Sequence, residues 1–244
     1  MLCKRLANGE LDVALVSSFE FLRNPIYRIV DDVCISSDGP VYSVVVAHRG
    51  KISEIEEIEL DPASQTAVNL LRCILGELGL RPRFKSGVLG STGCQPAVAG
   101  SLPTIRHARL LIGDHAIRFR ESHARELQFW DLGEQWKKHV GLPFVYALWL
   151  IRPEVADARE IATRLRALRD QNLVTLEKLI GEAAGTSAAA GEPKKVEREF
   201  LSRYYRENLH FRFGERQKKG LHAFASLCAR NGLLQKHKFE FSLV

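Results

Sequence analysis

The sequence predicts a mixed α/β fold made of two lobes with a ligand cleft between them. Short apolar runs rich in β-branched residues, typical of buried strands, alternate with stretches in which apolar residues recur every three or four positions, typical of helices. Such alternation is typical of α/β proteins. Two of the apolar runs, at 41–47 and 144–151, stand on either side of a middle block of about a hundred residues. These two runs predict a pair of crossovers between the lobes.

The expected elements follow in chain order. Strands are expected at 13–16, 41–47, 109–112 and 144–151, because each of these apolar runs is bounded by Gly, Pro or Asp. A helix is expected over 64–78, where the apolar residues share one face. One long amphipathic helix is expected over 155–184, a linker of small and polar residues over 185–193, and further helices over 195–207 and after Gly214.

The crossovers divide the chain into lobes. If the chain passes between the lobes near 43–47 and returns near 144–149, lobe one consists of 1–42 and 150–244, and lobe two of 43–149. The helical C-terminal part then completes lobe one. Ligand sites occur preferentially at such interfaces, so the cleft between the lobes is the expected site.

The composition favours anionic partners without naming one. The net charge of +6 is a mild excess of Lys and Arg that is spread along the whole sequence. No basic run is interleaved with aromatic residues, so nucleic acid is not an expected partner. No run of about eighteen apolar residues is present, so no membrane span is expected. The sequence contains no feature that specifies an oligomeric state.

The cysteines and the start of the chain favour the cytoplasm. The five cysteines are odd in number and contain no C-x-x-C pair, which predicts neither a disulfide framework nor a metal site. Charged residues interrupt the first twenty positions, so no secretory signal is expected. No H-E-x-x-H, G-x-S-x-G, Walker or G-x-G-x-x-G motif occurs, so neither a metal nor a nucleotide cofactor is expected.

The segment LDPASQT at 60–66 is the first candidate for a ligand contact. It ends a predicted strand and opens a helix, so Ser64, Gln65 and Thr66 gather hydroxyls and free backbone N–H groups at a helix N-terminus. Such a site attracts carboxylates. A second interpretation is that Ser64 or Thr66 simply caps the helix, and both roles are compatible.

Four further residues carry polar groups beside predicted strands. Ser43 stands at the start of the first crossover, and Ser17 and Ser18 end the strand at 13–16. Ligands of α/β folds bind beyond the carboxyl ends of strands, although a serine there is also tolerated without any function. Asp114 follows the strand at 109–112, where it either orients a substrate hydroxyl or caps the next helix.

The segments above also occur, in the same order, in a known enzyme family. They are GELDVALVSSFEF from Gly9, SSDGPVYSVV from Ser36, LDPASQT from Leu60, LLIGD from Leu110, DLGEQW from Asp131, GLPFVYALW from Gly141 and LHFRFGERQKKGLHAF from Leu209. Each segment is weakly specific by itself. Together they cover nearly the whole chain, which resembles the chorismate dehydratase family of menaquinone biosynthesis.

The resemblance implies a periplasmic-binding-protein-like fold of type II, used as an enzyme in the cytoplasm. The implied activity is that of a hydro-lyase, which removes water from chorismate, a dicarboxylate, to give 3-[(1-carboxyvinyl)oxy]benzoate in the futalosine route, without metal or organic cofactor. It also implies that Ser43 contacts the substrate near the reacting hydroxyl, and that Ser64, Gln65 and Thr66 hold a carboxylate.

The family pattern also makes a prediction about the start of the chain. Members normally begin with a strand and a Tyr-Leu-Asn loop whose asparagine is thought to be catalytic, whereas the first residues here match the helix before GELDVALV. About forty further residues are therefore expected before Met1, so that lobe one lacks its first strand here. Two alternatives stay open: the sister enzyme that forms 1,4-dihydroxy-6-naphthoate, and a binding protein that captures a small carboxylate without chemistry.

Overall fold

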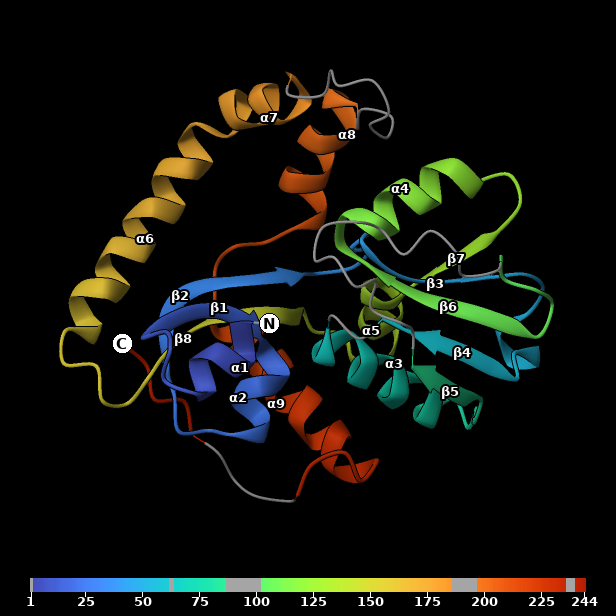
Figure 1. Ribbon diagram of the computed structural model, residues 1–244, viewed down its shortest axis with the longest axis horizontal. Coiled ribbons are helices and arrows are strands. Elements are labelled where there is room, and N and C mark those ends of the chain that lie inside the picture. Colours follow the sequence, from blue (N-terminus) through green and yellow to red (C-terminus); the bar gives the residue numbers. More distant parts are fainter. Residues whose placement is uncertain (1, 62–63, 87–101, 186–196, 236–239) are drawn as a thin grey trace.

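The computed structural model describes residues 2–61, 64–86, 102–185, 197–235 and 240–244, and it contains two separate β-sheets (Figure 1). The smaller sheet has the strand order β1-β8-β2, formed by Val13–Ser17, Phe144–Ile151 and Arg28–Ser37. Both outer strands run antiparallel to β8. Because β8 is central, it buries side chains on both faces, which explains its continuous apolar sequence.

The larger sheet has the order β5-β4-β6-β3-β7. Its strands are Val44–His48 (β3), Glu57–Leu60 (β4), Arg83–Ser86 (β5), His107–Ile112 (β6) and Gln128–Asp131 (β7). Strand β3 is buried along its whole length. It runs antiparallel to β6, whereas β4 runs parallel to β6. The start of β3 and the ends of β4 and β6 therefore lie at one edge of the sheet.

Helices surround and connect the sheets. Near the N-terminus lie α1 (Leu2–Ala7) and α2 (Ser18–Arg23), and the larger sheet carries α3 (Gln65–Glu77), α4 (Gly113–His123) and α5 (Leu132–Val140). A 3-10 turn spans Ile52–Glu54. From β8 the chain continues into α6 (Ala158–Val174), α7 (Leu176–Gly185) and α8 (Arg198–Arg203), which form an arch, and α9 (Glu215–Arg230) packs below (Figure 1).

The structure corrects two of the expected boundaries. The strand expected at 41–47 begins only at Val44, because Tyr42 has a positive φ of 68° that no regular strand can contain. The single helix expected over 155–184 is two helices that are separated at Thr175. The Thr175 hydroxyl donates to the Gln171 carbonyl at 3.0 Å, a bond known to bend helices, while the Thr175 carbonyl already accepts from Lys178 of α7.

The last helical segments also differ from expectation. The helix expected over 195–207 is described only from Arg198, and it ends in a π-helical turn, Tyr204–Asn208. The linker expected over 185–193 lies outside the described residues except for Gly185, the last residue of α7. The helices expected over 64–78 and after Gly214 are confirmed as α3 and α9.

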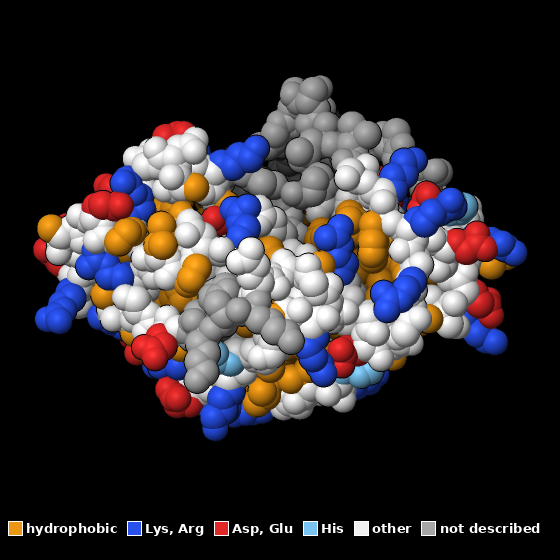
Figure 2. All heavy atoms as spheres, turned by 90° about the horizontal axis from the view of Figure 1, so that it is seen from below, with side chains coloured by type: hydrophobic (Ala, Val, Ile, Leu, Met, Phe, Trp, Pro, Cys, Tyr) orange, Lys and Arg blue, Asp and Glu red, His pale blue; other side chains and the backbone are white. Residues whose placement is uncertain are grey.

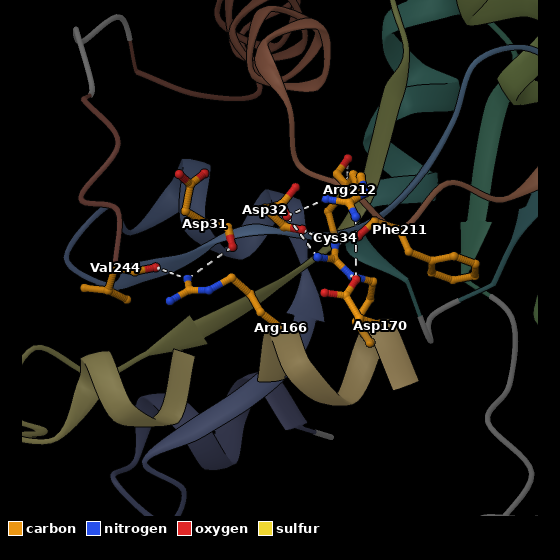
Figure 3. A network of polar contacts seen from close by, with 9 residues as sticks. Asp31, Asp32, Cys34, Arg166, Asp170, Phe211, Arg212 and Val244 are labelled. Carbon is orange, nitrogen blue, oxygen red and sulfur yellow. Dashed lines mark hydrogen bonds and ion pairs between the residues drawn. The ribbon is translucent and has the colours of Figure 1, made fainter. Parts of the chain in front are cut away.

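An ion pair and hydrogen bonds from two arginines of α6 fasten the arch to the smaller sheet (Figure 3). Strand β2 contains a bulge at which Asp32 takes a positive φ of 59°. Arg169 of α6, with a side chain only 6% exposed, donates to the Asp32 carboxylate at 2.9 Å and to the Phe211 carbonyl at 3.2 Å. Arg166 donates to the Val244 carbonyl at 3.0 Å. One face of α6 thus holds the bulge, the segment before α9 and the end of the chain together.

A close contact between α9 and the loop before β8 predicts a large effect of one methyl group. A Cβ on Gly220 would overlap the carbonyl oxygen of Pro143 and lie 3.2 Å from its carbonyl carbon. Gly220→Ala should therefore lower the free energy of unfolding by about 1–3 kcal/mol, measured by urea denaturation, although Ala favours helices. Gly181→Ala in α7 is the control: its Cβ meets nothing within 4 Å, and it should stabilise by about 0.5–1 kcal/mol. Equal effects of both substitutions would contradict the packing argument.

Candidate active site

The polar residues expected at the site lie along one edge of the larger sheet. Ser43 directly precedes β3, Gly113 follows β6, and the segment that leads into α3 follows β4. A hydrogen bond of 2.8 Å from the Gly113 N–H to the Ser43 carbonyl joins two of these positions. Ser43, Ser64, Gln65, Thr66 and Asp114 therefore stand beside strand ends at the same edge of the larger sheet.

Ser17, Ser18 and Thr66 form a cluster that connects the two sheets. The Ser17 and Thr66 hydroxyls make a short hydrogen bond, the Thr66 N–H donates to Ser17 Oγ at 3.0 Å, and the Phe19 N–H donates to Thr66 Oγ1 at 3.1 Å. Ser18 is fully buried and donates to the Val145 carbonyl at 2.7 Å. The end of β1 is thereby fixed against the start of α3.

Ser64 caps the N-terminus of α3, as one of the two interpretations of this segment predicted. Ser64 Oγ accepts from the Ala67 N–H at 3.2 Å. The Thr66 N–H is already used by Ser17, so the N–H of Gln65 is the first donor of this helix without a partner among the described residues. Gln65 is half-buried, and a helix N-terminus attracts negative charge. The capping interpretation of Ser64 is confirmed, and the cap leaves the Gln65 N–H without a partner among the described residues.

Ser43 lies in a buried aromatic environment that sequence analysis did not foresee. Its side chain is only 5% exposed, and its Oγ accepts a hydrogen bond of 2.8 Å from the Tyr204 hydroxyl. The ring of Tyr204 stacks on Phe200 at 5.8 Å, and Phe200 contacts the ring of Tyr42 at 4.7 Å. Arg120 of α4 lies over the ring of Tyr42, with its guanidinium carbon 3.9 Å from the ring centroid.

Asp131 holds the backbone beside Ser43. It caps α5 through a 3.0 Å bond from the Glu134 N–H, and its carboxylate also accepts from the N–H groups of Val41 at 3.1 Å and Tyr42 at 2.7 Å. Burial raises the pKa of this carboxyl, and the three N–H donors oppose that rise. The buried carboxylate of Asp131 therefore maintains the positive φ of Tyr42, the residue that precedes Ser43.

Asp114 is exposed in the first turn of α4, one residue after Gly113. The N-cap of this helix is Ile112, and no side chain caps it, so the capping interpretation of Asp114 is wrong. The charge of Asp114 helps burial to raise the pKa of Tyr204 and of Tyr205. Asp114 therefore lies close enough to these two hydroxyls to be felt electrostatically at the same end of the sheet.

Sequence analysis missed the contributions of Tyr204 and Asp131. Asp131 was noted only as the first residue of the DLGEQW segment, because its bonds to Val41 and Tyr42 join residues about ninety positions apart. Tyr204 belonged to a predicted helix whose partner could not be named. The only available signal was the pair of adjacent tyrosines at 204 and 205 in an otherwise charged segment.

Other features of the described residues bear on the kind of site. They contain no group of three or more His, Cys, Asp or Glu side chains that could hold a metal ion. None of their helices combines the length and apolar character that a membrane crossing requires. On the face shown in Figure 2, Lys and Arg side chains lie among Asp and Glu side chains, so the excess positive charge is not gathered there.

Comparison with known proteins identifies the family. A family model described as menaquinone biosynthesis matches residues 1–230. The chain belongs to this menaquinone biosynthesis family. A relative named chorismate dehydratase, from Thermus thermophilus, is 28% identical over 238 residues, which cover 90% of this chain and 80% of the relative. The family predicted from the ordered segments is confirmed.

Solved structures place this member of the menaquinone biosynthesis family among binding-protein-like folds. A protein from Archaeoglobus fulgidus has a TM-score of 0.64 and 20% identity, with 96% of this chain and 84% of that chain covered. The alkanesulfonate-binding protein SsuA from Xanthomonas axonopodis pv. citri, bound to MOPS, has a TM-score of 0.59 and 14% identity, with 96% and 80% covered. The predicted fold class, a two-lobed α/β fold of the periplasmic-binding-protein kind, is confirmed.

Proposed function

We propose that this protein is a lyase that dehydrates chorismate to 3-[(1-carboxyvinyl)oxy]benzoate on the futalosine route of menaquinone biosynthesis. The observation that carries the proposal is the match to a relative named chorismate dehydratase along 90% of this chain, within a family described as menaquinone biosynthesis. The sites at the edge of the larger sheet agree with it chemically, because they combine serine hydroxyls with a helix N-terminus that suits a carboxylate.

The reaction makes modest demands on the protein. A ring proton and a hydroxyl leave chorismate together, and the formation of an aromatic ring drives the step. Positioning and removal of water can supply much of the acceleration, so neither a strong base nor a metal is required. A buried hydroxyl such as that of Ser43 is suited to donate a hydrogen bond to the departing oxygen, which strengthens as negative charge develops there.

Each expected site residue has a place in this proposal. Ser43 is the catalytic residue beside the leaving hydroxyl. The segment Ser64, Gln65 and Thr66 binds one carboxylate at the N-terminus of α3 through the Gln65 N–H, the donor left without a partner among the described residues. Ser17 and Ser18 hold that segment against β1. Asp114 accepts a hydrogen bond from a substrate hydroxyl, since it is exposed and near the sheet edge that carries Ser43.

The compartment and the lobe boundaries form part of the same proposal. A biosynthetic role on a small dicarboxylate fits a cytoplasmic enzyme, and the cysteines among the described residues, Cys3, Cys34, Cys73 and Cys228, are all free. Lobe one comprises 1–42 and 150–244, and lobe two comprises 43–149. Lobe one contains β1 and β2 of the smaller sheet, and lobe two contains the larger sheet together with 144–149 of β8, the central strand of the smaller sheet.

The decisive experiment incubates the purified protein with chorismate and follows carboxyvinyloxybenzoate by mass spectrometry. We expect the chorismate signal to fall while a product lighter by one water appears. If chorismate stays unchanged but binding is measured by calorimetry, the protein is a carboxylate-binding protein and not this enzyme. Unchanged chorismate without binding would overturn both and would direct the search to the sister reaction that forms 1,4-dihydroxy-6-naphthoate.

A further inference from the structure

The Tyr204 hydroxyl reaches the candidate catalytic serine from a distant part of the chain. Tyr204 begins the π-helical turn after α8, and its hydroxyl lies 2.8 Å from Ser43 Oγ. In Figure 1, α8 descends from the arch into the region between the two sheets. We propose that Tyr204 is a positioning residue that donates to Ser43 Oγ and thereby directs the proton of Ser43 toward the substrate. The proposal rests on the proposed function, because it gives Ser43 its role as donor.

The direction of this hydrogen bond decides what Ser43 can do. A serine hydroxyl has one proton and two acceptor positions. Once Oγ accepts from Tyr204, the remaining proton must point to another acceptor, and none is bonded to it among the described residues. A buried donor without a partner is costly, so a substrate oxygen at this place gains an interaction that the described residues do not supply.

Packing keeps the Tyr204 ring in one orientation. Its plane lies 14° from that of Phe200, and the two ring centroids are 5.8 Å apart. Tyr204 itself is only 9% exposed. On the outer side of the turn, Glu177 of α7 accepts from Arg206 at 2.8 Å and from Arg198 at 3.2 Å, which joins α7 to α8. Single π-helical turns are frequent at functional sites, and here the turn carries the residue that touches Ser43.

The environment also keeps the tyrosine protonated. Burial raises the pKa of Tyr204 to about 12, the bond to Ser43 lowers it, and the charges of Asp114 and Asp131 favour the neutral form. Arg120, on α4, faces the neighbouring Tyr42 ring rather than Tyr204. Tyr204 therefore stays a donor at pH values at which a tyrosine with its ordinary pKa has ionised. A tyrosine with its ordinary pKa would lose its proton as the pH approaches 10, and the activity would fall. Ionisation of Tyr204 should cause no such loss of wild-type activity between pH 8 and pH 10.

Tyr204→Phe tests the proposal because it removes one oxygen and leaves the ring. We expect kcat for chorismate to fall about tenfold to a hundredfold while KM changes less than threefold, since the lost interaction acts on the transition state. Tyr205→Phe is the matched control, because it lies in the same turn and has no bond to Ser43; its kcat should equal that of the wild type.

A second comparison separates positioning from general stability. If Tyr204 acts through Ser43, the double variant Ser43→Ala, Tyr204→Phe should be no slower than Ser43→Ala alone. Wild-type kcat in Tyr204→Phe, or rate losses that multiply in the double variant, would overturn the proposal. If the wild type does not convert chorismate, the proposed function fails. The melting temperatures of Ser43→Ala, Tyr204→Phe and the double variant then test the hydrogen bond between the two residues by itself. Losses of melting temperature that simply add in the double variant would refute that bond as well.

Discussion

Replacing Ser43 by alanine should lower kcat for chorismate by about a hundredfold to a thousandfold, the loss typical of removing one donor aimed at developing charge. The side chain is small and buried, so alanine fills most of its volume. What disappears is the hydroxyl at the start of β3, with its bond to Tyr204. Steady-state kinetics measures the effect, and circular dichroism with thermal melting checks that the fold persists.

Ser36→Ala is a matched control for this substitution. Ser36 is also a buried serine that has a side-chain hydrogen bond, 3.2 Å to the His210 carbonyl, but it belongs to β2 of the smaller sheet. Both variants lose one buried hydrogen bond, so each should lose about 0.5–1.5 kcal/mol of stability. Only Ser43→Ala should lose turnover. Wild-type rates in Ser43→Ala, or equal rate losses in both variants, would remove Ser43 from the mechanism.

Much of the fold follows from local patterns. Strands β1, β6 and β8 lie where the apolar runs predicted them, because a buried strand needs a run of apolar residues whatever its partner. Strands β2, β5 and β7 were not predicted, and β4 was expected only through its end, which the LDPASQT segment marks. β5 is exposed along its length and β4 and β7 have four residues each, so their sequences carry little apolar signal. β2 contains the Asp31-Asp32 bulge, which breaks its pattern.

The site is predictable only where function and local structure coincide. Ser64 stands at a helix start, and Ser43 stands beside a strand, so both positions could be marked from sequence. Tyr204 and Asp131 act over separations of 161 and 90 residues. No local pattern encodes such contacts, because they arise from the way α8 and α5 pack against the segment before β3. The family resemblance supplied the reaction, whereas the structure supplied these supports.

Asp131→Ala should be the most destabilising single substitution near the site, with a loss of about 3–5 kcal/mol in the free energy of unfolding measured by urea denaturation. Three N–H groups lose their acceptor at once, and one of them belongs to Tyr42, whose positive φ then loses its support. Each buried donor without a partner costs about 1–3 kcal/mol, and loss of an N-cap costs about 1. The N–H groups of Tyr42 and Glu134 are only partly buried, so water reduces the summed cost of the three lost bonds to about 3–5 kcal/mol.

Asp157→Ala distinguishes this support from ordinary helix capping. Asp157 also occupies an N-cap position, that of α6, but its side chain makes no capping hydrogen bond and it is exposed. Its removal should change stability by less than about 0.5 kcal/mol. Because Tyr42 adjoins Ser43, Asp131→Asn, which keeps one acceptor oxygen, should remain folded yet lose turnover through a displaced Ser43. If Asp131→Ala and Asp157→Ala cost the same, the carboxylate of Asp131 does not hold the segment before β3.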